Sequence, residues 1–333
     1  MSGSFSCGAR AGLFVALASA LASPLFAACD VSSTVGFNAA LPGGSCSAES
    51  AISACRTDPC VVTEIGSAQP GSWAIAVDRE SVFFERTLTV LSRVSIRGGP
   101  VTDVRTDLDR LWMAAVDEDY VYTTEFEMGV RRAKKSGGPT ELVMRPRGTF
   151  TALALDRDYV YVTLTSENQI AMVEKAGGEP TLLAGQAAPA AIAVDDHHVY
   201  WVNQGSESGA TGELVRAPLG DLTHAEILLS GLGSPNALAI GAEDVFFASG
   251  SAVFQVSKEG GTATLVEDDF GPVKTMAAHG DTVYLAGAAG LGRARAGFAT
   301  HVADSRGMLG IAVTCEGAFA TGWFESLLVR YSR

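Results

Sequence analysis

The chain has 333 residues, 47% of them hydrophobic, and its 24 Lys and Arg against 37 Asp and Glu give a formal net charge of −13. This apolar content is ample for a packed core and excludes a disordered chain. The negative charge disfavours nucleic acid and anionic membrane surfaces, because like charges repel, so we expect no nucleic-acid partner. We interpret the one short basic run as a solvated third strand and its turn, at Arg131, Arg132, Lys134 and Lys135.

Residues 1–28 have the pattern of a secretory signal peptide. Arg10 precedes the apolar run AGLFVALASALA, and small residues follow it. Pro24 and the shortness of the run argue against a membrane-spanning helix. Two cleavage sites compete: Ala20-Leu21-Ala22 suits ordinary signal peptidase, whereas Phe26-Ala27-Ala28-Cys29 resembles a bacterial lipobox with Phe in the usual place of Leu. We therefore expect an exported, cell-envelope protein whose Cys29 is a lipidation site, with membrane attachment only through that lipid.

The cysteine count bears on the same choice. Cys7 leaves with the signal, and cleavage near Ala22 leaves five cysteines, whereas lipidation of Cys29 leaves an even set of four. An even set is typical of disulfide-bonded proteins in oxidising compartments. Residues 29–60 are rich in Ser, Gly, Ala and Cys without a sustained period, which indicates a tether and a small cap. We expect disulfides Cys55–Cys60 and Cys46–Cys315, and the two other pairings of these four cysteines stay open.

A hairpin motif recurs seven times after residue 61. Its clearest copy, AIAVDDHHVYWVN from Ala191 to Asn203, joins an alternating apolar run, a polar turn and an aromatic, β-branched run. Counted from Asp78, the equivalent turn positions recur at intervals of 39, 39, 39, 46, 38 and 35 residues, at Asp117, Asp156, Asp195, Gly241, His279 and Thr314. Gly-Gly pairs, which supply the positive φ of tight hairpins, follow at Gly98-Gly99, Gly137-Gly138, Gly177-Gly178 and Gly260-Gly261.

These signals predict four antiparallel strands in each unit of about 40 residues, which is the pattern of a β-propeller. The third repeat shows all four strands, at residues 152–155, 160–164, 170–174 and 181–183. The seventh repeat lacks a fourth strand, and Val61 to Ile65 (VVTEI) resembles the fourth strands of other repeats. We therefore predict an all-β, seven-bladed propeller over residues 61–333, closed by Val61 to Ile65 pairing with Leu327 to Tyr331.

The fourth repeat carries a family resemblance through Asp195, Tyr200, Trp201, Asn203, Arg216 and Gly220. These residues resemble the YWTD repeats of low-density-lipoprotein-receptor propellers and, more loosely, NHL-type repeats. The resemblance covers residues 61–333 and is partial outside the fourth repeat. Those receptor propellers have six blades, whereas seven are predicted here. The resemblance implies an extracellular binding platform, here in an exported bacterial version.

One face of the predicted propeller is acidic, because it carries the turns between first and second strands. Carboxylates suit calcium, so a cation site is one interpretation of Asp78, Asp117, Asp156 and Asp195. We favour the alternative that each Asp caps its own tight turn. The turn from Asp195 to His198 offers ligands for a transition metal, but adjacent turn residues point apart. We therefore expect no metal and no cofactor.

The opposite face carries the connections that differ most between repeats, and variable loops on a constant scaffold are where binding usually occurs. Rim packing between blades is the alternative role for its aromatic residues. The candidates near the channel mouth are Trp73, Trp112, Phe150 and Asn236. The candidates in loops are Phe126, Trp323 and Phe324, together with Asn203 at the start of the insertion NQGSESGATG.

Propeller enzymes of lyase or lactonase type resemble this chain in fold and place His, Glu or Asp at the starts of the inner strands. Here those positions read Trp73, Trp112 or Met113, Thr151, Ala191, Ala237, Thr275 and Gly310. No Ser-His-Asp arrangement, phosphate loop or zinc spacing is found. We therefore expect a monomeric, non-catalytic binding or scaffold module for an unknown protein, peptide or glycan, with a channel enzyme as the alternative.

Overall fold

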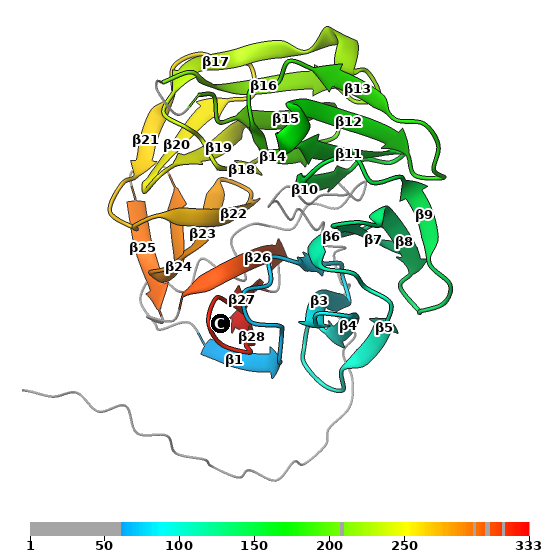
Figure 1. The fold of residues 1–333 in the computed structure, drawn as a ribbon. Coiled ribbons are helices and arrows are strands. Elements are labelled where there is room, and N and C mark those ends of the chain that lie inside the picture. Colours follow the sequence, from blue (N-terminus) through cyan, green and yellow to red (C-terminus); the bar gives the residue numbers. More distant parts are fainter. Residues whose placement is uncertain (1–60, 207–209, 296–297, 304–306, 315–316, 333) are drawn as a thin grey trace, which may run out of the picture.

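The computed structural model describes residues 61–206, 210–295, 298–303, 307–314 and 317–332. Its strands form seven four-stranded sheets arranged around a central axis (Figure 1). The predicted all-β, seven-bladed propeller is confirmed. In the described part of the chain, two short 3-10 helices interrupt the strands, η2 (Thr165–Glu167) and η3 (Leu222–His224). Within the described residues, no helix has the length and apolarity needed to cross a bilayer.

The blades follow one another along the chain, and each runs from an inner to an outer strand. Blade 1 contains β2 (Ile75–Val77), β3 (Ser81–Thr87), β4 (Val90–Ser95) and β5 (Thr102–Arg105). Blade 2 contains β6 (Leu111–Val116), β7 (Tyr120–Glu125), β8 (Gly129–Lys134) and β9 (Glu141–Met144). Blade 3 contains β10 (Phe150–Leu155), β11 (Tyr159–Leu164), β12 (Gln169–Glu174) and β13 (Thr181–Ala184).

The same order continues around the ring. Blade 4 contains β14 (Pro189–Val194), β15 (His198–Asn203), β16 (Gly212–Pro218) and β17 (Glu226–Leu232). Blade 5 contains β18 (Ala237–Ile240), β19 (Asp244–Ser249), β20 (Ala252–Ser257) and β21 (Thr264–Glu267). Blade 6 contains β22 (Val273–His279), β23 (Thr282–Gly287), β24 (Gly290–Arg295) and β25 (Phe298–Ala303).

The seventh blade joins the two ends of the propeller. It contains β26 (Met308–Thr314), β27 (Gly317–Gly322), β28 (Leu328–Ser332) and, as its outer strand, β1 (Val61–Gly66). Strand β1 pairs antiparallel with β28, with Val62 opposite Tyr331 and Glu64 opposite Val329 (Figure 1). The predicted closure is confirmed. This pairing removes an open edge on β28 that would otherwise expose its backbone groups.

The core lies between neighbouring blades rather than at the centre of the ring. Phe83 and Leu91 of blade 1 pack with Val121 of blade 2, and Tyr161 of blade 3 packs with Trp201 of blade 4. Each sheet is covered on both faces, so its inner strands read as nearly continuous apolar runs instead of alternating ones.

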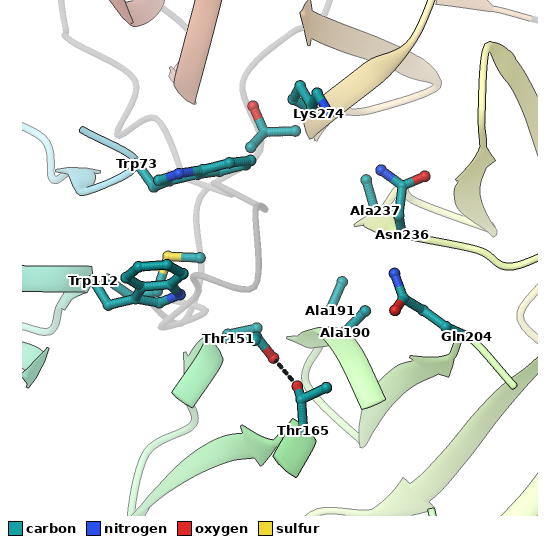
Figure 2. A pocket seen from close by; sticks show the side chains of 13 residues that line it. Trp73, Trp112, Thr151, Thr165, Ala190, Ala191, Gln204, Asn236, Ala237 and Lys274 are labelled. Carbon is teal, nitrogen blue, oxygen red and sulfur yellow. Dashed lines mark hydrogen bonds between the residues drawn. The ribbon is translucent and has the colours of Figure 1, made fainter. Parts of the chain in front are cut away.

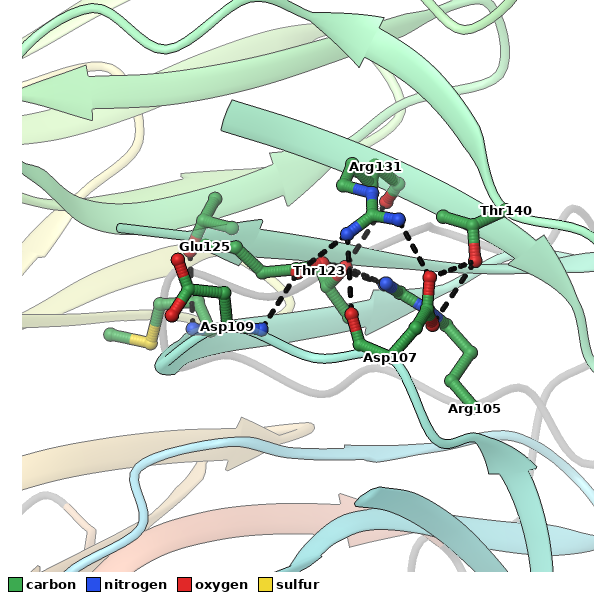
Figure 3. Close-up of polar contacts among 9 residues, drawn as sticks. Arg105, Asp107, Asp109, Thr123, Glu125, Arg131 and Thr140 are labelled. Atoms are coloured by element: carbon green, nitrogen blue, oxygen red, sulfur yellow. Dashed lines mark hydrogen bonds and ion pairs between the residues drawn. The ribbon is translucent and has the colours of Figure 1, made fainter. Parts of the chain in front are cut away.

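Blades 1 and 2 are also joined by an ion cluster with a buried centre, formed by Arg105, Asp107, Glu125 and Arg131 (Figure 3). The Arg105 and Glu125 side chains have no exposed surface, and Nη1 of Arg105 lies 2.7 Å from Oε1 of Glu125. The same Nη1 donates to the Thr123 hydroxyl at 2.7 Å. Arg131 reaches the second carboxylate oxygen of Glu125 at 3.1 Å. The cluster therefore ties β5 to the sheet of blade 2.

The interpretation of the basic run as solvated is wrong for three of its four residues. Arg131 belongs to the ion cluster, Arg132 pairs with Glu141 at 2.7 Å, and Lys135 pairs with Asp78 at 2.8 Å. Only Lys134 is exposed. The sequence does not show these pairings, because the acidic partners lie on other strands of the same blade or in the neighbouring blade.

The predicted signal peptide (residues 1–28), the tether (29–60) and the lipidation site Cys29 lie outside the described residues. The same holds for the four cysteines of the expected disulfides, Cys46, Cys55, Cys60 and Cys315. These assignments remain predictions.

Candidate functional site

The inner strand of most blades begins with a β-bulge. In blade 2, Leu111 pairs with Glu125 and Met113 pairs with Thr124, so Trp112 is an extra residue on its strand. The same shift makes Thr151, Ala190 and Lys274 the extra residues of blades 3, 4 and 6. A bulge bends the strand and re-aims the side chain of its extra residue.

The backbone group that a bulge releases is satisfied locally. The N–H of Met113 donates to the Thr124 hydroxyl at 3.1 Å, and in blade 7 the N–H of Gly310 donates to the Thr321 hydroxyl at 3.0 Å. A Thr on the second strand therefore replaces the lost ladder partner. This satisfies the buried N–H and permits the bulge without an unpaired donor.

The equivalent residue of each repeat lies at the same end of the channel. It belongs to the bulge in blades 2, 3, 4, 6 and 7, and it precedes an inner strand without a register shift in blades 1 and 5. Each such residue lies five positions before the turn position of its repeat. The full set is Trp73, Trp112, Thr151, Ala190, Asn236, Lys274 and Leu309. All except Leu309 line one pocket at the channel mouth. The scaffold thus repeats, while the side chains that it presents change from blade to blade.

The pocket has a volume of about 240 Å³ (Figure 2). The indoles of Trp73 and Trp112 lie on one side of it, and Asn236 and Gln204 lie across from them (Figure 2). Lys274 lies at the top of this view, between Trp73 and Asn236. The Thr151 hydroxyl, at the bottom of this view, forms a hydrogen bond with the Thr165 hydroxyl at 2.6 Å. The arrangement offers aromatic surface on one side and polar groups on the other, as in sites that orient a ligand through a few polar contacts.

Two of the polar side chains in the pocket have hydrogen-bonding capacity to spare. Asn236 donates from Nδ2 to the carbonyl of Val273 at 2.9 Å, which holds the side chain in place. The Gln204 side chain lines the pocket, and within the described residues only its backbone N–H is bonded, to the Ala188 carbonyl at 3.0 Å.

Three of the eight predicted ligand-binding residues, Trp73, Trp112 and Asn236, line the pocket. Phe150 is 3% exposed and packs in the core, because the bulge in β10 turns Thr151 toward the channel instead. Asn203 is 1% exposed, and its Nδ2 donates to Gln186 at 3.0 Å and Glu213 at 3.1 Å. These two side chains stabilise the blades that carry the site.

The other three candidates lie in exposed turns of the variable-loop face. Phe126 is 48% exposed beneath the guanidinium of Arg110, 5.4 Å from its ring centroid. Trp323 and Phe324 stack on each other at 5.4 Å, and Phe324 is 77% exposed. Trp323 also lies 5.4 Å from the ammonium of the pocket residue Lys274. The aromatic surface of the pocket therefore continues onto blade 7.

Sequence reasoning missed Lys274, Gln204 and Thr165. Lys274 could have been found, because it occupies the same repeat position as Trp73 and Trp112. Gln204 and Thr165 follow the second strands of their blades, where loop conformation decides the direction of a side chain. No sequence signal marks them.

On the opposite face, the expectation that each turn aspartate caps its own turn is confirmed. Oδ1 of Asp195 accepts the N–H groups of His197 and His198, both at 2.8 Å. Asp78, Asp117 and Asp156 repeat this arrangement with the residues two and three positions later. Within the described residues, no three His, Cys, Asp or Glu side chains are grouped to hold a metal ion.

The second oxygen of these aspartates connects neighbouring blades. Lys135 of blade 2 bonds Asp78 of blade 1 at 2.8 Å, and Lys175 of blade 3 bonds Asp117 of blade 2 at 3.0 Å. Lys258 repeats the contact with Asp195 at 3.0 Å. Burial raises the pKa of Asp195, but its backbone hydrogen bonds and the Lys258 ammonium lower it further, so the net pKa is below its usual range.

Comparisons with known proteins identify the fold. No family model and no curated protein matches the chain. Among solved structures, it is similar to a virginiamycin B lyase from Staphylococcus aureus, a catalytically inactive His→Ala variant with quinupristin. The TM-score is 0.67 and the identity 14%, and the match covers 82% of this chain and 99% of that one.

Two other similar structures are binding complexes. YCF48 bound to D1 peptide matches with a TM-score of 0.63 and 12% identity over 83% of this chain and 97% of that one. A chain of the nidogen/laminin complex matches with a TM-score of 0.54 and 15% identity over 69% of this chain and 96% of that one. The three share its propeller fold. At these identities the likeness concerns the fold alone, and the YWTD or NHL character of the repeats stays an expectation.

Proposed function

We propose that this protein is an exported binding module that holds a protein or peptide partner at the channel mouth on its variable-loop face. The observation that carries the proposal is the ring of equivalent positions at the starts of the inner strands. Six of them line the pocket, and on a repeated backbone they present Trp73, Trp112, Thr151, Ala190, Asn236 and Lys274. Such a division between a repeated scaffold and variable presented residues is typical of binding surfaces.

The size of the pocket supports a macromolecular partner. Its volume of about 240 Å³ lies below the roughly 300–1,000 Å³ of sites that enclose a whole drug-sized ligand. One or two side chains of a larger partner fit this space. The half-buried Trp323 and the exposed Phe324 beside it supply apolar contact area outside the pocket, as aromatic anchors do at protein interfaces.

The similar structures are consistent with this class of partner. YCF48 was solved with a D1 peptide and nidogen with laminin, so propellers of this shape serve as platforms for peptides and proteins. The virginiamycin B lyase represents the alternative, a channel enzyme, and its inactive variant lacks a histidine. In this chain, the described residues that line the pocket include neither histidine nor carboxylate. A general acid or base of those types would have to come from elsewhere, so we favour binding.

Export is the second part of the proposal. It rests on the signal-like residues 1–28, and attachment to the membrane would occur through a lipid on Cys29. A propeller held by an N-terminal tether in the cell envelope could reach partners in the same compartment.

The proposal is tested with two tryptophan substitutions. Wild-type protein and the Trp73→Ala/Trp112→Ala variant are used as crosslinking baits in the cell envelope of the source organism, with quantitative mass spectrometry as the readout. We expect the variant to lose the specific partners, because the indoles supply the apolar wall of the pocket. Glu118→Ala/Asp119→Ala, on the exposed opposite face, is the matched control and should retain them. Equal capture by all three proteins would contradict a site at the channel mouth.

A further inference from the structure

The side chain of Lys274 sets the charge of the pocket. It is the one charged side chain among the described residues that line the pocket. Its ammonium lies 5.4 Å from the centroid of the Trp323 ring and forms no ion pair within the described part of the chain. Lys135, Lys175 and Lys258 are each paired with an aspartate, and Lys134 is exposed on the opposite face. A cation without a carboxylate partner beside an apolar pocket fits a ligand that brings its own anion.

The surroundings limit what kind of anion fits. The chain has a formal net charge of −13, which opposes the approach of multiply charged groups such as phosphates. Phosphate recognition usually relies on clustered arginines or backbone N–H groups, and one lysine does not supply these. A singly charged carboxylate requires only one such cation, with hydrogen-bond donors nearby.

The remaining pocket groups match a peptide. The Gln204 amide and the Asn236 carbonyl oxygen can pair with the N–H and C=O groups of a peptide backbone. Trp73 and Trp112 form one side of the pocket, where they can contact a large apolar side chain, and Lys274 lies at the adjoining side, between Trp73 and Asn236 (Figure 2). A chain terminus is the part of a peptide that combines a backbone amide, a side chain and a carboxylate within a small volume, and capture of a terminal carboxylate is a known mode of peptide recognition.

We infer that the pocket captures the free carboxyl terminus of a protein or peptide that ends in a large apolar residue, with its carboxylate at Lys274 and its last side chain between the indoles. This inference rests on the proposed function, because it names the partner of the same site. It predicts that the carboxyl-terminal end of a peptide is recognised, and that Lys274 selects this end.

The test uses a library of random heptapeptides with free carboxyl termini and the same library with amidated termini. Binding of selected peptides is measured by isothermal titration calorimetry and by tryptophan fluorescence, because three of the four tryptophans lie in or beside the pocket. We expect selection of free-terminus peptides ending in an aromatic or large aliphatic residue. Amidation should weaken each of them about tenfold, as expected for loss of a hydrogen bond between charged groups.

Variants connect this preference to Lys274. Lys274→Met should weaken the free-terminus peptides about tenfold and leave the amidated peptides unchanged, so that the preference disappears. Lys134→Met removes the same charge from an exposed position on the opposite face and should leave both affinities as in the wild type. Lys274→Gln is a second variant that keeps a polar side chain and should behave as Lys274→Met does.

Three results would overturn the inference. If free and amidated peptides bind equally, and Trp73→Ala abolishes both, the proposed binding function stands but the recognition of a terminus is wrong. A preference for free termini that persists in both Lys274 variants places the carboxylate elsewhere. If no peptide binds with dependence on Trp73, or a glycan array is bound instead, both the inference and the proposed peptide-binding function fail.

Discussion

Glu85 is a carboxyl group whose ionisation the fold opposes. It lies near the end of β3 and is only 4% exposed. Burial raises the pKa of Glu85 from 4.5 to about 7, although a hydrogen bond from the Ser72 hydroxyl lowers it in part. The equivalent positions in blades 2, 3 and 7 are Thr124, Thr163 and Thr321, which hydrogen-bond as neutral hydroxyls. A neutral group is therefore what this environment accommodates best.

This shift predicts a pH-dependent stability. The folded pKa of Glu85 lies above its unfolded value, so between pH 4.5 and about 7 the folded state holds more protons and stability falls as pH rises. Glu85→Gln should raise the free energy of unfolding by about 2 kcal/mol at pH 8 and change it little near pH 4.5. Urea denaturation at both pH values measures this. Glu80→Gln, an exposed position in the same blade, should show no such pH dependence; an equal effect of Glu85→Gln at both pH values would disprove the assignment.

At the scale of elements, the ion pairs of the sheets are of two strengths. Exposed pairs such as Arg86–Asp103, with side chains 41% and 37% exposed, contribute little because water and salt screen them. The Arg105–Glu125 pair is fully buried, so water cannot take the place of either partner. Removing one partner leaves a buried charge only partly compensated.

Arg105→Met should therefore destabilise the protein by about 3 kcal/mol. The double variant Arg105→Met/Glu125→Leu should recover much of this loss, because two apolar side chains leave no buried charge without its partner. Arg86→Met is the matched surface control and should cost less than about 1 kcal/mol. Denaturant unfolding of the four proteins decides between these outcomes. If Arg105→Met and Arg86→Met lower the free energy of unfolding equally, the buried pair contributes no more to stability than the exposed pair does.

At the scale of the whole molecule, the ring closes through few residues. Strand β1 is held on blade 7 by its pairing with β28 and by the burial of Ile65 beside Leu328 and Phe84. A covalent link would strengthen the closure. The expected Cys46–Cys315 disulfide would join the segment before β1 to the turn of blade 7, and in the chain-entropy model a loop of this length stabilises by about 4 to 5 kcal/mol.

Mass spectrometry of the protein purified from the cell envelope tests this closure. Under non-reducing conditions we expect peptides linked through Cys55–Cys60 and Cys46–Cys315, and a mature N-terminus at a lipid-modified Cys29. Cys315→Ser should then lower the melting temperature of the oxidised protein. Under reducing conditions, the variant and the wild type should melt at the same temperature, because neither then contains the disulfide. A free Cys315 in the oxidised protein would show that pairing and packing alone close the ring.

Much of this architecture is determined by local sequence. The spacing of the turn aspartates and Gly-Gly pairs predicts seven similar sheets, and the missing fourth strand of the last repeat predicts that β1 closes the ring. These features are readable because hairpins depend on turn chemistry and on neighbouring residues. The positions of Trp73, Trp112 and Asn236 at the channel mouth follow from the same repeat.

Other features depend on residues that are distant in the chain. Phe150 and Thr151 are adjacent in sequence, and only the bulge against β11 decides that Thr151 faces the channel while Phe150 enters the core. Lys135 and Asp78 meet across two blades, as do Arg105 and Glu125, so their pairing required the assembled ring. The sequence by itself determined the repeat and its closure, because these arise from local backbone preferences. Tertiary structure decided which side chains share the pocket and which charges are neutralised, because both depend on how the strands and blades pack.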